Sequence, residues 1–156
     1  MEQCEKTFAE LIPELKDWNR GNGIDVEAWL KCVGSFEHAI GYSHLFWPDF
    51  VEHDDCILAS GFTEAGYQAF MQQTRGNRRA VESVINHRHI VDLFVDPKLQ
   101  PTRDQLVYIG RTLKEVWSAK LRRDFPTRDI TVSFPEGEYS ELTDYEITFF
   151  QNEHTV

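Results

Sequence analysis

Residues 129–134 read DITVSF and residues 144–150 read DYEITFF, and these two short stretches decide the fold class. In both, large apolar side chains recur at every second position. A period of two predicts strands with one buried face. The segment between them is polar and holds Pro135 and Gly137, which favours a turn or loop. We therefore expect an antiparallel β-pair near the C-terminal end of the chain.

Most of the remaining chain has the periodicity of helices. The clearest signal is a capping box at Thr102 and Gln105, which opens a long helix to about Arg123. Before it, apolar residues three or four apart predict one continuous helix from Arg78 to the break at Asp96–Pro97. Shorter helices are predicted over residues 5–19, 25–33, 35–46 and 63–73. Pro13 lies inside the first of these, so that helix either starts near Pro13 or kinks there.

Residues 50–58 predict a small hairpin, because two β-prone runs flank the polar pair Asp54–Asp55. A lone hairpin is marginally stable, so the C-terminal pair must pack on helices or pair with residues 50–58. The expected fold is α+β, a mainly helical single domain over residues 1–156. It would contain about six helices and the C-terminal antiparallel β-pair. In one alternative, a short strand near residues 50–58 pairs with this β-pair and extends it.

The composition is that of a globular protein, with 41% hydrophobic and 27% charged residues in a chain of 156. No apolar run approaches the ~20 residues that a membrane-spanning helix needs. The first residues, MEQCEKTFAE, are charged and lack the apolar segment of a signal peptide. These features predict a soluble, cytoplasmic protein without a membrane partner.

The charge is strongly acidic and unevenly distributed. The net charge is −10, and residues 129–156 hold seven acidic residues with no lysine or arginine. Residues 101–128 are instead basic. An acidic protein repels nucleic acid and attracts basic proteins, which makes a nucleic-acid partner improbable and favours a basic protein partner. Simple solubility explains the same charge without any partner.

The three cysteines, Cys4, Cys32 and Cys56, are widely spaced and form no C-x-x-C pair. A zinc ribbon and a thioredoxin-type site are therefore excluded. Free, buried thiols in a reducing compartment are the default expectation.

His87-Arg88-His89 is the most conspicuous group of polar residues. On the predicted helix, residues two apart point about 200° away from each other, so the two imidazoles would not share one ion. His87 falls on the apolar stripe and is predicted to be a buried, hydrogen-bonded core residue. His89 shares the other side with Asp92, and a His–Asp pair is able to support acid–base chemistry but is also an ordinary surface contact.

Residues 37–55 hold enough histidines and carboxylates to bind a metal. However, the sequence has no H-E-x-x-H motif and no EF-hand loop, and a proline break separates His44 from His53. Glycine-rich phosphate loops and serine-nucleophile motifs do not occur either. We therefore predict no metal site and no cofactor.

No motif assigns the chain to a family. The leading hypothesis is a non-enzymatic, acidic interaction protein that binds a basic protein partner. In acidity, size and lack of catalytic motifs it resembles bacterial toxin-neutralising immunity proteins, at the level of composition only. The alternative is a small metal-dependent or His/Asp hydrolase centred on His89, Asp92 and the 37–55 segment. The residues expected to bind the partner are Glu52, Asp54, Asp55, Glu136, Glu138, Glu141 and Glu146.

Overall fold

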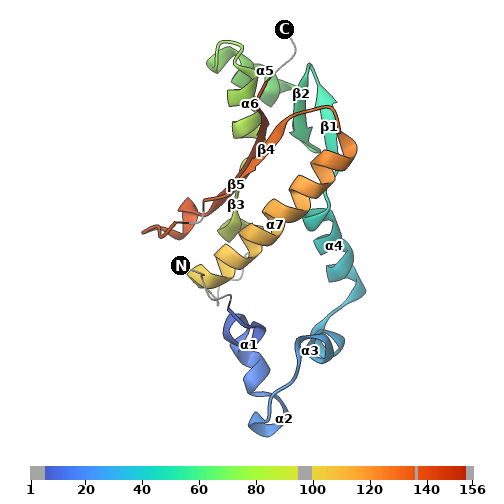
Figure 1. Cartoon of the computed structure of the whole chain (residues 1–156), viewed down its shortest axis with the longest axis vertical. Coiled ribbons are helices and arrows are strands. Elements are labelled where there is room, and N and C mark those ends of the chain that lie inside the picture. Colours follow the sequence, from blue (N-terminus) through green and yellow to red (C-terminus); the bar gives the residue numbers. More distant parts are fainter. Residues whose placement is uncertain (1–5, 95–99, 136, 154–156) are drawn as a thin grey trace. The chain divides into compact units, whose positions relative to one another are not determined.

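The structure is a computed structural model that describes residues 6–94, 100–135 and 137–153. Its helices and two small antiparallel sheets confirm the predicted mainly helical α+β class (Figure 1). The chain forms two compact units, Met1–Ser43 and His44–Val156, here called unit 1 and unit 2. A single domain over residues 1–156 stays a prediction.

Unit 1 consists of short helical segments. They are α1 (Phe8–Leu11), the 3-10 helix η1 (Pro13–Lys16), α2 (Trp18–Gly21), α3 (Val26–Val33) and most of α4 (Phe36–Phe46). The break expected near Pro13 is present, but the predicted helix over residues 5–19 is divided into three short segments. Pro13 has no N–H to continue a helix, so it opens η1 instead, and Asn19 and Arg20 adopt left-handed φ angles of 54° and 58°.

The capping residues predicted for α3 and α4 are confirmed. The Asp25 carboxylate accepts a hydrogen bond from Ala28 N at 2.9 Å, and Ser35 Oγ accepts one from His38 N at 3.2 Å. Helix α4 ends just before Trp47–Pro48, where helical angles are disfavoured. Neither helix contains a buried residue, and Phe36 of α4 is 88% exposed.

Unit 2 begins with the predicted hairpin, β1 (Phe50–His53) and β2 (Cys56–Ala59). Its two turn residues, Asp54 and Asp55, have φ angles of 48° and 65°. Two left-handed residues form the turn whose twist matches an antiparallel pair, and aspartate tolerates that conformation. Helix α5 (Glu64–Gln73) follows, with the Thr63 hydroxyl accepting a hydrogen bond from Gly66 N as its cap.

The continuous helix predicted from Arg78 is wrong beyond its second turn. Helix α6 covers Arg78–Ile85, after which Arg88–His89 form strand β3 and Ile90–Leu93 form the 3-10 helix η2. The expected end at Asp96–Pro97 lies outside the described residues. Pairing of Arg88 and His89 with a neighbouring strand selects the extended form over the predicted helix.

The C-terminal pair predicted from DITVSF and DYEITFF is confirmed as β4 (Ile130–Ser133) and β5 (Glu146–Gln151). The sheet order is β3-β5-β4, so β3 is the third strand. Residues 50–58 do not extend this sheet, because β1 and β2 pair only with each other. The 3-10 helix η3 (Leu142–Asp144) lies in the segment between β4 and β5.

Two buried side chains, from Glu82 of α6 and from Asn86 at its C-cap, connect the two sheets instead of a backbone ladder. Glu82 accepts hydrogen bonds from Ile57 N on β2 and from Gln151 N on β5, both at 2.7 Å. Asn86 accepts from Ala59 N and donates to the carbonyl oxygens of Ile57 and Phe149. The polar groups along the facing edges of β2 and β5 are thereby satisfied by side chains.

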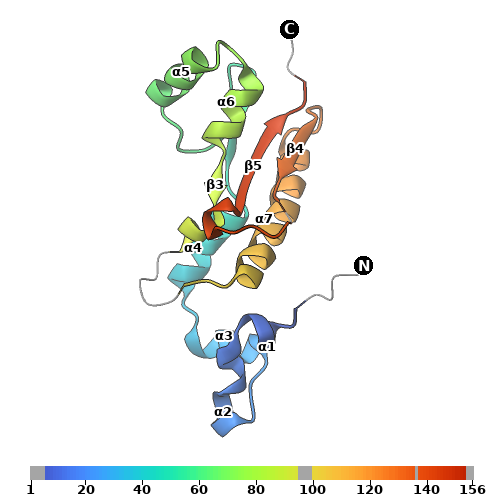
Figure 2. The same cartoon turned by 90° about the vertical axis from the view of Figure 1, so that its left-hand side faces the viewer.

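Helix α7 (Arg103–Asp124) opens at the predicted capping box and lies along the β4–β5 pair (Figures 1 and 2). Gly110 allows a close approach, since a Cβ there would lie 2.1 Å from the Phe134 ring. The larger core cluster of unit 2 contains Phe50, Ile57, Ile90, Leu106, Leu113, Trp117, Leu121, Val132, Phe134, Tyr145, Ile147 and Phe149. Among the described helices, none has the length and apolar character to cross a membrane.

Candidate functional site

The short β3–β5 ladder brings two histidines and one glutamate together. His89 of β3 is the direct cross-strand partner of Glu146 on β5. His87 immediately precedes β3, and its imidazole ring lies against that of His89. The three side chains therefore gather on one face of the ladder, and we call them the His87–His89–Glu146 cluster.

The distances within this cluster are short. His87 Nε2 lies 2.9 Å from Glu146 Oε2, which is a hydrogen bond, and His89 Nδ1 lies 3.9 Å from the same oxygen. The two imidazole centroids are 4.4 Å apart in an edge-to-face arrangement. The cluster is partly open to solvent, since the side chains of His87 and His89 are 32% and 34% exposed.

A further hydrogen bond orients His89. Its Nδ1 lies 2.7 Å from the carbonyl oxygen of Thr143, just before β5. A carbonyl oxygen only accepts, so Nδ1 carries the proton and donates. The other ring nitrogen, Nε2, then keeps its lone pair. This is the arrangement in which protein imidazoles commonly bind metals.

The cluster has the donor set of a metal site. Each of the three residues offers a ligand atom, and these atoms lie within 4.8 Å of one another. Two imidazole nitrogens with one carboxylate oxygen suit zinc and related first-row divalent cations. His87, His89 and Glu146 are thus the described residues best placed to hold a metal ion.

Sequence reasoning missed this cluster because it placed His87 and His89 on a helix. The apolar stripe of the predicted helix placed His87 in the core, but its side chain is only partly buried. The prediction that His87 is hydrogen-bonded is confirmed, since it bonds to Glu146. His87-Arg88-His89 has no alternation of apolar and polar residues, so the sequence carries no clear strand signal at this point.

The predicted pairing of His89 with Asp92 does not form. Within the described part of the chain, His89 is hydrogen-bonded to Thr143 and no hydrogen bond or ion pair joins it to Asp92. In the 37–55 segment, His53 Nε2 lies 3.1 Å from Glu64 Oε2, but the two atoms are not aligned for a hydrogen bond.

The acidic residues of the β1–β2 hairpin are partly neutralised within the protein. Arg128, just before β4, donates to Asp55 Oδ1 at 2.6 Å and also to the Glu52 carboxylate. These contacts, with the Asp55 hydrogen bond as the largest cause, raise the pKa of Arg128. Asp54 remains exposed in the turn beside His53.

The other predicted acidic residues lie toward the opposite end of β5. Glu146 begins that strand, whereas Gln151 at its end bonds to the Asp55 carbonyl. Five residues of strand separate these two ends by about 17 Å. Glu138 and Glu141 lie in the β4–β5 connector and are exposed, and Glu136 falls outside the described residues. The described members of the expected set therefore lie at two separate places, one at the β1–β2 hairpin and one near the start of β5.

Comparisons with known proteins leave the family open. No protein-family model matches the chain, and neither curated proteins nor solved structures provide a match.

Proposed function

We propose that this chain is a non-enzymatic interaction protein whose acidic β4–β5 connector binds a basic protein partner. A toxin-neutralising protein of the immunity type is one concrete form of this function. The observation that carries the proposal is the set of exposed carboxylates on this connector, Glu138, Glu141 and Asp144. We call these three residues the connector carboxylates.

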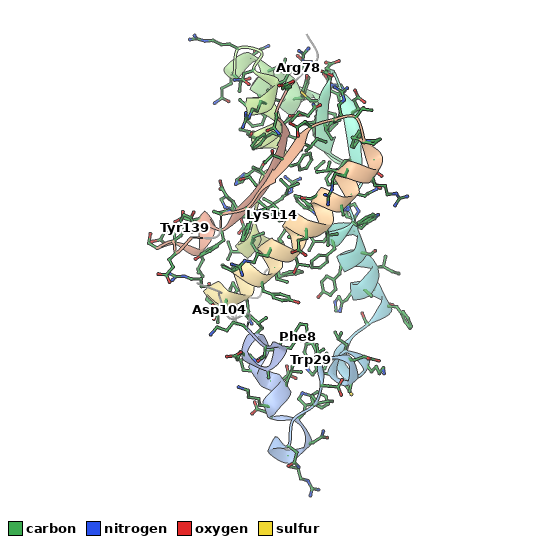
Figure 3. All side chains as sticks on the ribbon, in the orientation of Figure 1. Phe8, Trp29, Arg78, Asp104, Lys114 and Tyr139 are labelled. Atoms are coloured by element: carbon green, nitrogen blue, oxygen red, sulfur yellow. The ribbon has the colours of Figure 1, made fainter. Side chains whose placement is uncertain are left out.

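The conformation of the connector supports the proposal, because several contacts hold it in place. The buried Tyr145 hydroxyl donates to the Gly137 carbonyl and accepts from Tyr139 N, at 3.3 and 3.4 Å. Arg103, in the first turn of α7, donates to the Tyr139 carbonyl at 2.7 Å. Figure 3 labels Tyr139 on the connector and Asp104 in the first turn of α7. A loop held this way loses less conformational freedom on binding.

The electrostatic surroundings of the connector carboxylates also support the proposal. The side chain of Glu138 is 92% exposed, and its Oε2 lies 3.9 Å from Arg103 Nη1. No ion pair joins Glu141 or Asp144 to another described residue. Exposed like charges repel one another, and a cationic partner relieves that repulsion. Glu52 and Asp55 contribute less to this surface, because Arg128 already neutralises them.

Charge reversal tests the proposal. The tag-free protein is used to capture partners from a lysate of the source organism at low salt, and the retained protein is identified as salt rises. The association rate of that partner is then measured with Glu138→Lys, Glu141→Lys and Asp144→Lys combined. We expect a decrease of about tenfold or more at low salt, with a weaker salt dependence, because opposite charges steer association.

A matched control separates the connector from net charge. Reversing three other exposed carboxylates, Asp17, Glu115 and Glu153, changes the net charge by the same amount. This control should retain most of the association rate. Equal slowing in both variants would show that net charge acts alone, and an unchanged rate in the connector variant would remove the basis of the proposal.

A further inference from the structure

We infer that the His87–His89–Glu146 cluster is a binding site for one divalent first-row transition-metal ion, with Zn²⁺ as the expected occupant. This inference is independent of the proposed partner binding, which rests on other residues. The pairing of β3 with β5 brings the members of this site together, so the inference gives that pairing a chemical role.

The backbone already supplies most of the required geometry. The cross-strand register fixes His89 opposite Glu146, and His87 immediately precedes β3 with its ring 4.4 Å from that of His89. Ligand atoms around a tetrahedral zinc ion at ~2.1 Å lie about 3.4 Å apart. The His87–Glu146 distance of 2.9 Å is already in this range, and the full cluster lies within 4.8 Å. The three side chains therefore lie close enough for their ligand atoms to share one ion after small adjustments in position.

The surroundings of the cluster also favour a cation. The Thr143 carbonyl accepts the Nδ1 proton of His89, which leaves Nε2 available as a ligand and orients the ring. The nearest basic side chain in sequence, Arg88, is bonded to the carbonyl oxygens of Ile85 and His87. The carboxylates Glu141 and Asp144 precede β5, and the whole chain carries a net charge of −10.

The hydrogen bonds of the cluster leave one imidazole nitrogen of His89 unused. His87 bonds to Glu146 and His89 Nδ1 donates to Thr143, whereas His89 Nε2 makes no hydrogen bond to any described residue. A metal ion uses a lone pair from each of the three side chains. Three protein ligands leave a coordination position for water, and the bound ion would link β3 to β5.

Zinc binding to the tag-free full-length protein tests this inference. Metal is first removed with a chelator, and Cys4 and Cys32 are replaced by serine so that thiols do not contribute. Calorimetric titration with Zn²⁺ should then give one site per chain. His87→Ala and His89→Ala should each weaken binding by more than the roughly 10–100-fold loss that follows removal of a partner outside the ligand shell.

Two controls make the test specific. His53→Gln removes the other imidazole that lies beside a carboxylate, and it should leave zinc affinity unchanged. Glu146→Gln keeps the size of the side chain but removes the anionic ligand, so it should also weaken binding. Circular dichroism and urea unfolding in the absence of metal check that each variant is folded.

A second readout follows from the position of the cluster. Because the ion would join β3 to β5 only in the folded state, Zn²⁺ should raise the melting temperature of the wild type in a concentration-dependent way. The His87→Ala variant should lack this effect. Absence of stoichiometric zinc binding, or equal losses in the His53→Gln and His89→Ala variants, would overturn the inference.

Discussion

The thiol of Cys56 lies in the smaller core cluster of unit 2, with Leu58, Tyr67 and Val81, and none of its surface is exposed. Burial first, and then the negative charge of Glu82, raise the pKa of this thiol to about 11. Its sulfur lies 4.0 Å from the Tyr67 hydroxyl, whose pKa burial raises to about 12. Cys56 thus confirms the expectation of a buried thiol, whereas Cys32 is exposed and does not.

This difference predicts selective alkylation. In a Cys4→Ser variant at pH 8, iodoacetamide should label Cys32 readily and Cys56 at least ~100-fold more slowly. A thiol pKa of about 11 instead of 9.0 lowers the thiolate fraction at pH 8 roughly 100-fold, even before steric protection is considered. Mass spectrometry of timed, quenched samples measures both rates in one experiment.

Unfolding supplies the control for this prediction. In concentrated urea both thiols should react at similar rates, since the burial that distinguishes them is lost. Rapid labelling of Cys56 in the native protein would contradict its position in the core.

Helix α6 and its C-cap residue have an unusual role among the elements, because the side chains of Glu82 and Asn86 each bond to both β2 and β5. Glu82 and Asn86 are fully buried and lie one helical turn apart. Gln151 adds a third contact, donating from Nε2 to Glu82 Oε1 at 2.8 Å. A carboxylate in such a position is tolerated because backbone N–H groups and an amide satisfy its oxygens.

Substitutions in this bridge should be strongly destabilising. Asn86→Ala leaves Ala59 N–H and the carbonyls of Ile57 and Phe149 without their partner, so we expect a loss of about 3 kcal/mol in the free energy of unfolding. Glu82→Gln places an amide N–H against N–H donors and should lose about 2 kcal/mol. Urea unfolding monitored by circular dichroism measures both values.

Glu115→Gln on the exposed side of α7 is the matched control, and it should change the unfolding free energy by less than about 0.5 kcal/mol. If Glu82→Gln is as stable as this control, the bridge does not hold the two sheets together.

For the whole molecule, the distribution of the core between the two units has a direct consequence. Both core clusters belong to unit 2, and every side chain in them lies between Leu45 and Phe149. In unit 1, Leu11 and Leu15 are the described residues that are buried. Unit 2 therefore contains the apolar burial that drives cooperative folding.

A truncation tests whether unit 2 folds by itself. A chain that begins at Ser35 keeps α4 with its cap and lacks residues 1–34. We expect it to unfold cooperatively, with an unfolding free energy within about 1 kcal/mol of the full chain, because its core is intact. Urea unfolding followed by tryptophan fluorescence and circular dichroism measures this. Loss of cooperative unfolding would instead support the single domain predicted from the sequence.

Elements with strong local signals were predictable from the sequence. The capping box at Thr102, the cap at Asp25 and the two-residue turn at Asp54–Asp55 each depend on residues within four positions of one another. The β4–β5 pair followed from its alternation and from the single connector between its strands. In the caps and the turn, the groups that satisfy the backbone are neighbours in sequence.

The candidate site was not predictable in the same way. The three members of the cluster depend on a strand of two residues, and such a short strand has no reliable sequence signal. Its acidic member is separated from His87 by 59 positions. Contacts between distant segments likewise decide whether residues 50–58 pair directly with the C-terminal sheet or connect to it through the side chains of Glu82 and Asn86.

The sequence by itself thus determined the α+β class, most helix starts, the β1–β2 hairpin and the β4–β5 pair, because short-range hydrogen bonds and hydrophobic periodicity specify them. Only the tertiary structure decided that the chain leaves the helix after Ile85. There the Asn86 side chain bonds to β2 and β5, and Ile90 N donates to the Tyr145 carbonyl. These long-range hydrogen bonds outweigh local helical preference, and they turn His87 and His89 toward the same carboxylate.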